Sequence, residues 1–272
     1  IVVYYPVLDI ALELSSMGIR VDKEALLSQL EKEEADWDVA FGVSADALEE
    51  GKEYWQTGKD AWTGYSAVSF VILYNTNVVT YRELPTGWDS LLEPRWKGRV
   101  AVPDPLKSDM AASVLTEAAK NSEKEEFLDL LAENMQYQMP ETFKEVEQGI
   151  SDGRYSIGVT SEEAAKAMLA AGQDVDYIDP EEGECFFEDG TAIRKRTPNL
   201  DASEAFVTYT TCDDTKWLLR TQLLRQPAED VSAENDRSDE ELKQRYSRQQ
   251  EVLNFWKLIM EEKSGSAHEQ EQ

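Results

Sequence analysis

The sequence is poor in the residue types on which metal centres and most catalytic sites depend. Its 272 residues include one histidine, His268, and two cysteines, Cys185 and Cys212. A structural zinc site takes about four histidine and cysteine ligands, so we predict no such site. The chain has neither a Gly-x-Ser-x-Gly elbow nor a phosphate-cradling glycine loop. Carboxylates are too common for one pair to stand out, and we therefore expect neither an enzyme nor a cofactor.

Long apolar runs are also missing, and the basic residues are too few to balance the acidic ones. No segment approaches the roughly 18–20 apolar residues that span a bilayer, so we expect a soluble chain. The 27 basic residues stand against 55 acidic ones, which gives a net charge of −28. A field of this sign repels nucleic acid and anionic lipid, and excludes both as expected partners. A small anion then needs a local positive site, such as a helix N-terminus.

Short apolar runs alternate with segments of helical period along the chain. This alternation predicts an α/β fold whose mostly parallel sheets are flanked by helices. The predicted strands include 1–5, 37–42, 70–74, 99–102, 155–159 and 175–178. The predicted helices include 22–34, 110–120, 124–135, 140–148, 161–171 and 241–263.

The most distinctive segment joins two predicted buried strands. The apolar run Phe70–Tyr74 stops at Asn75, and a second run ends at Pro103. Between them, Pro85–Gly98 holds two prolines, two glycines and two tryptophans. Such a composition predicts an ordered, turn-rich connector.

This segment resembles the bacterial extracellular solute-binding proteins of ABC importers, in the branch that binds ferric iron, phosphonates and sugar phosphates. That branch shows a strand ending in Tyr-Asn-Thr, which is Tyr74-Asn75-Thr76 here. A Pro-x-x-Trp-x-x-Leu-x-x-Pro-x-Trp-Lys-Gly stretch follows, then Asp-Pro before a helix start that contains a serine. These correspond to Pro85–Gly98, Asp104-Pro105 and Ser108.

The resemblance implies a two-lobed, type II periplasmic-binding-protein-like fold with a ligand in the cleft between the lobes. Lobe I would comprise residues 1–73 and 182–272, with an abridged N-terminal part, and lobe II would comprise 74–181. The family is exported, so we expect an extracytoplasmic protein, periplasmic or a cell-surface lipoprotein, whose leader is absent from this sequence. Cys185 and Cys212 then either form one disulfide or stay separate small residues.

Helix starts at the cleft are the expected ligand contacts. Ser108 and Asp109 open one helix, and the acid at that position disfavours a doubly charged phosphate unless the ligand also carries an ammonium group. Thr160 and Glu163 lie at another helix start, where capping is the competing interpretation. The remaining candidates lie at strand ends or turns: Tyr5, Tyr74, Asn75 and Glu182.

Two departures from the family pattern make its usual cargoes less expected for this chain. Val21 runs into Asp22–Leu27 without a glycine-rich turn. The iron-binding relatives use neighbouring tyrosines late in the chain, whereas the only Tyr-Tyr pair here is Tyr4-Tyr5, inside a strand that sends the two rings to opposite faces.

We therefore predict a monomeric solute-binding protein of an ABC transporter that captures a small polar ligand, anionic or zwitterionic, for an ABC permease. The alternative is a sensing domain of the same fold that partners a membrane receptor. Fe(III) binding is the less favoured cargo.

Overall fold

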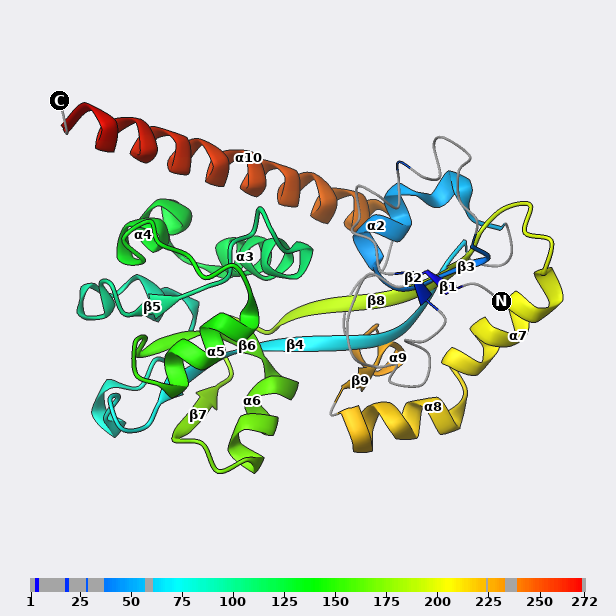
Figure 1. Cartoon of the computed structure of the whole chain (residues 1–272), viewed down its shortest axis with the longest axis horizontal. Coiled ribbons are helices and arrows are strands. Elements are labelled where there is room, and N and C mark those ends of the chain that lie inside the picture. Colours follow the sequence, from blue (N-terminus) through cyan, green and yellow to red (C-terminus); the bar gives the residue numbers. More distant parts are fainter. Residues whose placement is uncertain are drawn as a thin grey trace. The chain divides into compact units, whose positions relative to one another are not determined.

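The computed structural model describes residues 3–4, 18–19, 28, 37–56, 61–223, 225–232 and 239–270. Tyr5 and the glycine-poor segment 21–27 lie outside the described residues, as does the predicted helix 22–34 apart from residue 28. The chain divides into two compact units. Unit 1 comprises Ile1–Ala67 and Phe187–Gln244, and unit 2 comprises Val68–Phe186 and Arg245–Gln272 (Figure 1). The division is discontinuous, and the C-terminal helix belongs largely to unit 2.

Unit 1 is built on a small sheet of apolar strands. β1 (Val3–Tyr4) pairs in parallel with β2 (Gly18–Ile19) and β3 (Val39–Ser44), and β3 pairs antiparallel with β8 (Cys185–Ile193). The hydroxyl of Ser44 accepts a hydrogen bond from Ala47 and begins the next helix, because serine is a strong N-cap. The other elements of unit 1 are α2 (Ala45–Glu50), η1 (Lys52–Tyr54), α7 (Leu200–Thr210), α8 (Asp213–Leu218), η5 (Leu219–Leu223), β9 (Gln226–Pro227) and α9 (Ala228–Ser232).

An ion pair lies in the interior of unit 1. Nη2 of Arg225 is 2.5 Å from Oδ2 of Asp189, which also accepts a hydrogen bond from Ser66. Both charged side chains are buried. Burial raises the pKa of Asp189, and the Arg225 guanidinium opposes that shift. The pair ties the segment before β9 to β8.

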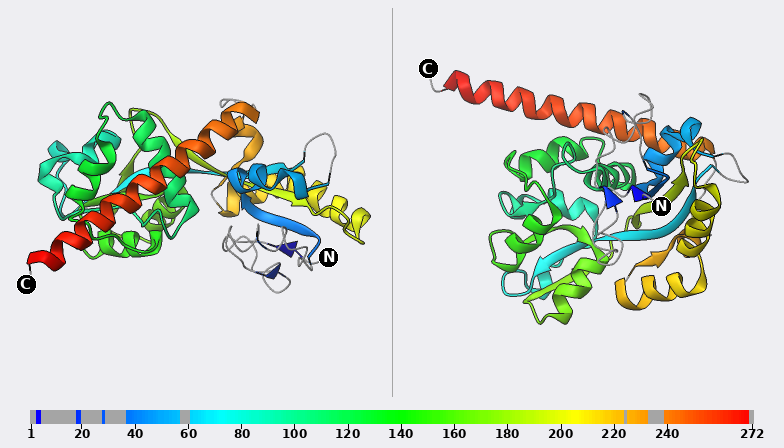
Figure 2. Two further views of the ribbon diagram at one scale, coloured as in Figure 1. Left: turned by 90° about the horizontal axis from the view of Figure 1, so that it is seen from above. Right: turned by 45° about the vertical axis from the view of Figure 1, so that its right-hand side comes forward.

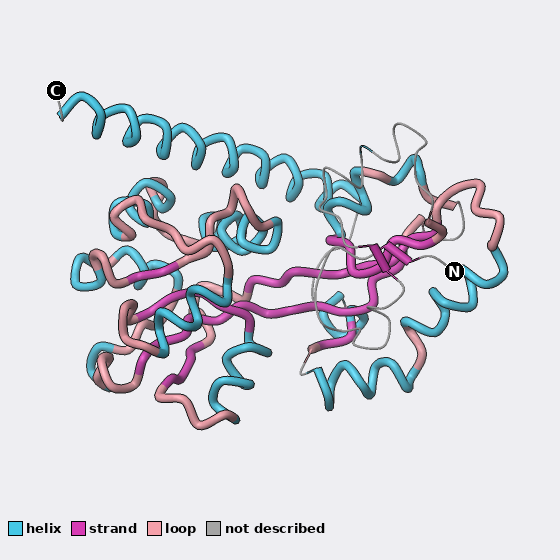
Figure 3. The backbone as a smooth tube through the Cα atoms, in the orientation of Figure 1, coloured by secondary structure: helices cyan, strands magenta, loops and turns pink. Residues whose placement is uncertain are grey.

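Unit 2 is organised around the second half of β4 (Thr63–Asn75), an almost wholly buried strand. It pairs antiparallel with β6 (Ile157–Ser161) and β7 (Val175–Ile178), while β5 (Val100–Ala101) runs parallel to β6. Figure 3 shows β4 and β8 as the two long strands whose residues belong to both units. The helices of unit 2 are α3 (Asp109–Asn121), α4 (Phe127–Asn134), α5 (Phe143–Ser151), α6 (Glu162–Ala170) and α10 (Asp239–Gln270).

The sheet is mixed rather than mostly parallel. β4 and β8 run antiparallel to the neighbours described above, whereas the parallel pairs are β1–β2, β1–β3 and β5–β6. The alternation of strands and helices predicts parallel neighbours. It cannot reveal two long strands that pass from one unit to the other.

The core of unit 2 depends on close approach of α5 to the sheet. Val146 and Ile150 of α5 pack on Val71 and Ala101. A Cβ on Gly158 of β6 would lie 2.5 Å from the Ala101 carbonyl oxygen and 2.9 Å from Val146. Glycine at this position therefore lets the helix and the neighbouring strand come together.

The connector that carries the family resemblance is a packing element of unit 2. It forms the short helices η2 (Tyr81–Glu83), η3 (Trp88–Leu92) and η4 (Pro94–Trp96). Trp88 is fully buried, and its indole donates to the Gly183 carbonyl at 3.0 Å. The connector is therefore packed against the segment that leads into β8.

Figure 2 shows α10, coloured orange to red, as a single long helix, and its first half contacts α3. The guanidinium of Arg245 donates to the Ser113 hydroxyl at 2.8 Å, and Gln249 donates to the Asp109 carbonyl at 3.4 Å. Trp256 and Ile259 form its buried stripe. The helical period predicts this amphipathic element.

Candidate functional site

Three helices of unit 2 begin at one edge of its sheet. β5 and β6 are parallel, so their carboxyl ends, which lead into α3 and α6, lie at the same edge. α5 begins there too, because the ring of Phe143 stacks on Phe70 at 5.7 Å and Phe70 pairs with Ser161. We name the starts of these helices, at Ser108, Thr142 and Ser161, the carboxyl edge.

Each helix start at the carboxyl edge carries a side-chain cap. The hydroxyl oxygens of Ser108, Thr142 and Ser161 accept from the amides of Ala111, Glu145 and Ala164, each at 3.2 Å. One hydroxyl satisfies one of the four amides that a helix leaves open at its N-terminus. Amides and dipoles from three helices therefore favour negative charge at this edge.

Acidic side chains moderate that preference. Asp109, Glu145, Glu162 and Glu163 lie in the first turns of the three helices. The Glu162 carboxylate accepts a hydrogen bond from Ser69 at 3.1 Å and pairs with Lys166 at 2.7 Å. An edge that combines open amides with carboxylates suits an anion of low charge or a group that also bears a cation.

The structure brings four of the predicted site residues to this edge. Ser108 is an N-cap, and Asp109 lies in the first turn of α3 under the contact with Gln249. Thr160 and Glu163 flank the start of α6. As ligand contacts they remain predictions.

Tyr74 and Asn75 lie at the other end of the same strands. They pair with Ile157 and Val175, the first residues of β6 and β7. The Tyr74 hydroxyl donates to Asp176 at 3.3 Å, and burial together with that carboxylate raises the pKa of Tyr74. The Asn75 amide donates to the Ile150 carbonyl at 2.6 Å. Five residues of extended chain, about 16 Å, separate Asn75 from Phe70 at the carboxyl edge.

Glu182 lies at a third place. Its carboxylate accepts from the backbone amides of Trp88 and Asp89, both at 2.9 Å, and so caps η3. A Cβ on Gly87 would lie 1.6 Å from that carboxylate, so the glycine of the connector makes the approach possible. These bonds give Glu182 a structural role.

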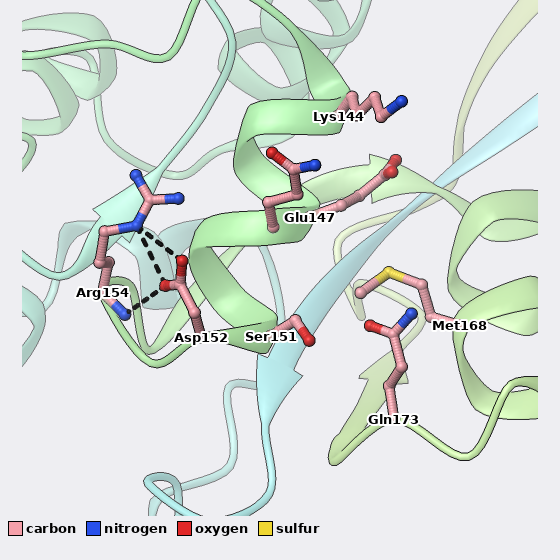
Figure 4. Close-up of a pocket in the computed structure, with 8 residues that line it drawn as sticks. Lys144, Glu147, Ser151, Asp152, Arg154, Met168 and Gln173 are labelled. Atoms are coloured by element: carbon pink, nitrogen blue, oxygen red, sulfur yellow. Dashed lines mark hydrogen bonds and ion pairs between the residues drawn. The ribbon is translucent and has the colours of Figure 1, made fainter.

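An open hollow of about 590 Å³ lies between α5 and α6 (Figure 4). Its lining comprises Lys144, Glu147, Gln148, Ser151, Asp152, Arg154, Met168 and Gln173. Thr160 connects the hollow to the carboxyl edge, because its hydroxyl donates to Oε1 of Glu147 at 2.7 Å. Burial raises the pKa of Glu147, while the Thr160 hydrogen bond and the Lys144 charge oppose that rise.

In the part of the chain that the structure describes, no cluster of three His, Cys, Asp or Glu side chains could hold a metal ion. Likewise, none of the helices it contains has both the length and the apolar character needed to cross a membrane. Cys185 and Cys212 are both free thiols. Of the two alternatives that the sequence leaves open, the structure has the separate residues.

Sequence reasoning missed Thr142 and the hollow. A signal for Thr142 was present, since Thr142-x-x-Glu145 is the capping-box pattern. Lys144 and Glu147 carry no such mark, because a lysine and a glutamate three apart on a charged helix look like an ordinary surface pair.

The chain has two α/β units that share two long strands, and helix starts gather at one sheet edge. This architecture is typical of receptors that bind small solutes. The model of the bacterial extracellular solute-binding protein family matches residues 24–250, and the chain belongs to that family. Members bind small molecules, work with ABC permeases and lie outside the cytoplasm. They are binding proteins rather than enzymes. The match supports the solute-binding interpretation and not the alternative of a sensing domain.

Solved structures agree in fold. The apo ferric ion-binding protein A of Pasteurella haemolytica has a TM-score of 0.77 at 16% identity, over 95% of this chain and 97% of that chain. The periplasmic binding protein AfuA of Actinobacillus pleuropneumoniae, with fructose-6-phosphate bound, has a TM-score of 0.76 at 15% identity, over 96% and 98%. The Campylobacter jejuni ferric binding protein has a TM-score of 0.76 at 14% identity, over 94% and 98%. The predicted type II fold is confirmed.

A short segment of the chain also matches a curated protein of a different kind. The aspartate–ammonia ligase of Ruminiclostridium cellulolyticum is 69% identical over 32 residues, which make up 12% of this chain and 10% of the ligase. The chain therefore spans about a tenth of that curated relative's length. A segment of this size assigns no ligase activity to this chain.

Proposed function

We propose that the carboxyl edge of unit 2 holds the solute, and that the solute is a small polar molecule that is singly anionic or zwitterionic. The gathering of three capped helix starts at one sheet edge carries this proposal. Their open amides attract an anionic group without any net positive charge on the protein. The first-turn acids at Asp109 and Glu163 disfavour a doubly charged group and favour an ammonium beside it.

Two relatives are named for ferric ion, and the third holds fructose-6-phosphate. Iron suits this chain less. Fe(III) prefers phenolate oxygen, whereas the pKa of Tyr74 is raised and its hydroxyl is bonded to Asp176. A doubly charged sugar phosphate would meet the acids of the carboxyl edge.

The proposal also includes a partner, an oligomeric state and a location. The partner is an ABC permease that receives the solute from this chain acting as a monomer. The chain is periplasmic or tethered to the cell surface as a lipoprotein.

A thermal-shift panel tests the ligand class. It comprises 2-aminoethylphosphonate, fructose-6-phosphate, putrescine and ferric citrate. A ligand at 100 times its Kd stabilises the folded state by about 2.7 kcal/mol, which raises the melting temperature measurably. We expect the zwitterion to give the largest shift, and a shift with ferric citrate alone contradicts the proposal.

Substitution at Ser108 tests the location. Asp and Asn both replace serine as N-caps, so Ser108→Asp and Ser108→Asn should fold equally well. Only the first adds a negative charge at the start of α3. We expect S108D to weaken binding of the best panel solute at least about tenfold, or about 1.4 kcal/mol, while S108N stays near wild type. Equal binding by both variants would show that the solute is not held at the start of α3.

A further inference from the structure

The hollow between α5 and α6 has the dimensions of a ligand site. Small-molecule pockets measure roughly 300–1,000 Å³, and this one is about 590 Å³. Its lining residues all belong to unit 2. The walls combine an apolar side chain, Met168, with polar ones such as Ser151 and Gln173. Figure 4 shows Met168 and Gln173 facing α5 from the other side of the hollow.

Two opposite charges on α5 line this hollow without pairing. Lys144 and Glu147 are three residues apart, a spacing at which opposite charges commonly form an ion pair. Figure 4 shows both side chains extending from the same side of the helix with their charged ends apart. Among the described residues neither forms an ion pair, and the one hydrogen bond of the Glu147 carboxylate comes from Thr160.

The other two charged residues of the lining, Asp152 and Arg154, form an ion pair with each other. Nε of Arg154 donates to both oxygens of Asp152, at 3.0 and 2.9 Å, and the guanidinium lies over the Tyr155 ring at 5.8 Å. The charge available to a ligand therefore comes from Lys144 and Glu147. A simple anion would meet Glu147, and a simple cation would meet Lys144. A molecule with one charge of each sign satisfies both.

We propose that this hollow is a second binding site, separate from the carboxyl edge, for a small linear zwitterion of the ω-amino acid type. The ammonium group pairs with Glu147, and the carboxylate pairs with Lys144. The methylene groups between them lie on Met168, whose buried side chain belongs to the apolar core. Ser151 and Gln173 offer a hydroxyl and an amide to the ligand's polar ends. Partial burial of the Glu147 carboxylate strengthens its attraction to an ammonium group.

Isothermal titration calorimetry on the whole chain tests the proposal. The probes are 3-aminopropionate, 4-aminobutyrate and 5-aminopentanoate, which differ only in the spacing of their charges. Butyrate and n-butylammonium are the singly charged controls. We expect at least one amino acid to bind at least about tenfold more tightly than either control, a difference of about 1.4 kcal/mol.

Matched variants assign the contacts. Glu147→Gln keeps the size and the hydrogen bond from Thr160 but removes the charge, and we expect affinity for the best amino acid to fall about 30-fold or more. Lys144→Gln, at a more exposed position, should lower affinity about fivefold. Glu133→Gln makes the same change on α4, at an exposed pair with Lys97 outside both the hollow and the carboxyl edge, and should leave affinity unchanged. Because E147Q removes a partly buried charge, it should fold at least as well as wild type.

Each result decides between the two sites. Binding of no probe by the wild-type chain overturns the inference, as does full affinity in E147Q or an equal loss in E133Q. Loss of amino acid binding in S108D, with E147Q unaffected, assigns the amino acid to the carboxyl edge and also overturns it. Loss in E147Q with S108D unaffected supports a second site, whatever the panel shows for the first.

Discussion

Two carboxylates inside the protein, Asp189 in unit 1 and Glu147 in unit 2, have opposite surroundings. Asp189 is fully buried against Arg225 and Ser66. Glu147 is partly buried, with a single hydroxyl partner in the described structure and an open hollow in front of it. A closed ion pair holds the fold together, whereas a carboxylate without a counter-ion is free to receive one from a ligand.

The largest expected effect on stability comes from breaking the buried ion pair between Asp189 and Arg225. Arg225→Met leaves Asp189 as an uncompensated buried charge, which costs about 3–5 kcal/mol. Urea unfolding of the variant should show a correspondingly lower midpoint. Arg220→Met is the control, because the pair between Arg220 and Asp230 is exposed, and such pairs contribute about 0–1 kcal/mol. Equal losses in the two variants contradict the contrast drawn above.

A smaller effect is expected at the single partner of Glu147. Thr160→Val removes the hydroxyl and leaves a partly buried carboxylate unsatisfied, a loss of about 1–3 kcal/mol in the free energy of unfolding. The same substitution in an E147Q background should cost less, because a neutral amide is easier to bury. Strict additivity in this double-mutant cycle shows that the two side chains do not interact.

Glu182 offers an intermediate case, a carboxylate satisfied by backbone amides. Glu182→Ala removes both caps of η3 and should lower stability by about 0.5–2 kcal/mol, as the loss of other helix caps does. Solute binding should persist, since Glu182 has a structural role in unit 2. Loss of binding at unchanged stability would show that Glu182 contacts the solute.

The smallest effect is a pH dependence. The pKa of Glu147 is raised above its ordinary value of 4.5 by burial. The folded state therefore binds a proton more tightly than the unfolded state, and the stability from this group is lost as pH rises from about 4.5 through the raised pKa. E147Q should gain stability relative to wild type over that window. Unfolding midpoints of both chains between pH 4 and pH 8 measure the difference, and a constant difference contradicts it.

How far the sequence predicts the fold depends on how local the signal is. The strand predicted over 175–178 is β7 without change, and the helix predicted over 161–171 is α6 within a residue at each end. β8 was largely missed, because Glu188, Asp189 and Gly190 interrupt its apolar pattern. The charge at Asp189 makes sense only with Arg225, which lies far along the chain.

The candidate site shows the same limit. Ser108 and Thr160 could be singled out because helix starts leave local signatures. Tyr74 and Asn75 carry the family motif, yet the antiparallel pairing of β4 places them at the end of the strands away from those helix starts. Strand direction is a property of the whole sheet, and neighbouring residues do not reveal it. Lys144 and Glu147 could be recognised as lining a hollow only from the structure, because its opposite wall comes from α6.

Amide hydrogen exchange of the whole chain, with and without the panel solute that raises the melting temperature most, tests the central claim most directly. We predict slower exchange at the first turns of α3, α5 and α6, at residues 108–111, 142–145 and 161–164. Slowing confined to the strand ends around Tyr74 and Asn75, or unchanged exchange at all three helix starts, would contradict the assignment of the carboxyl edge as the place where the solute is held.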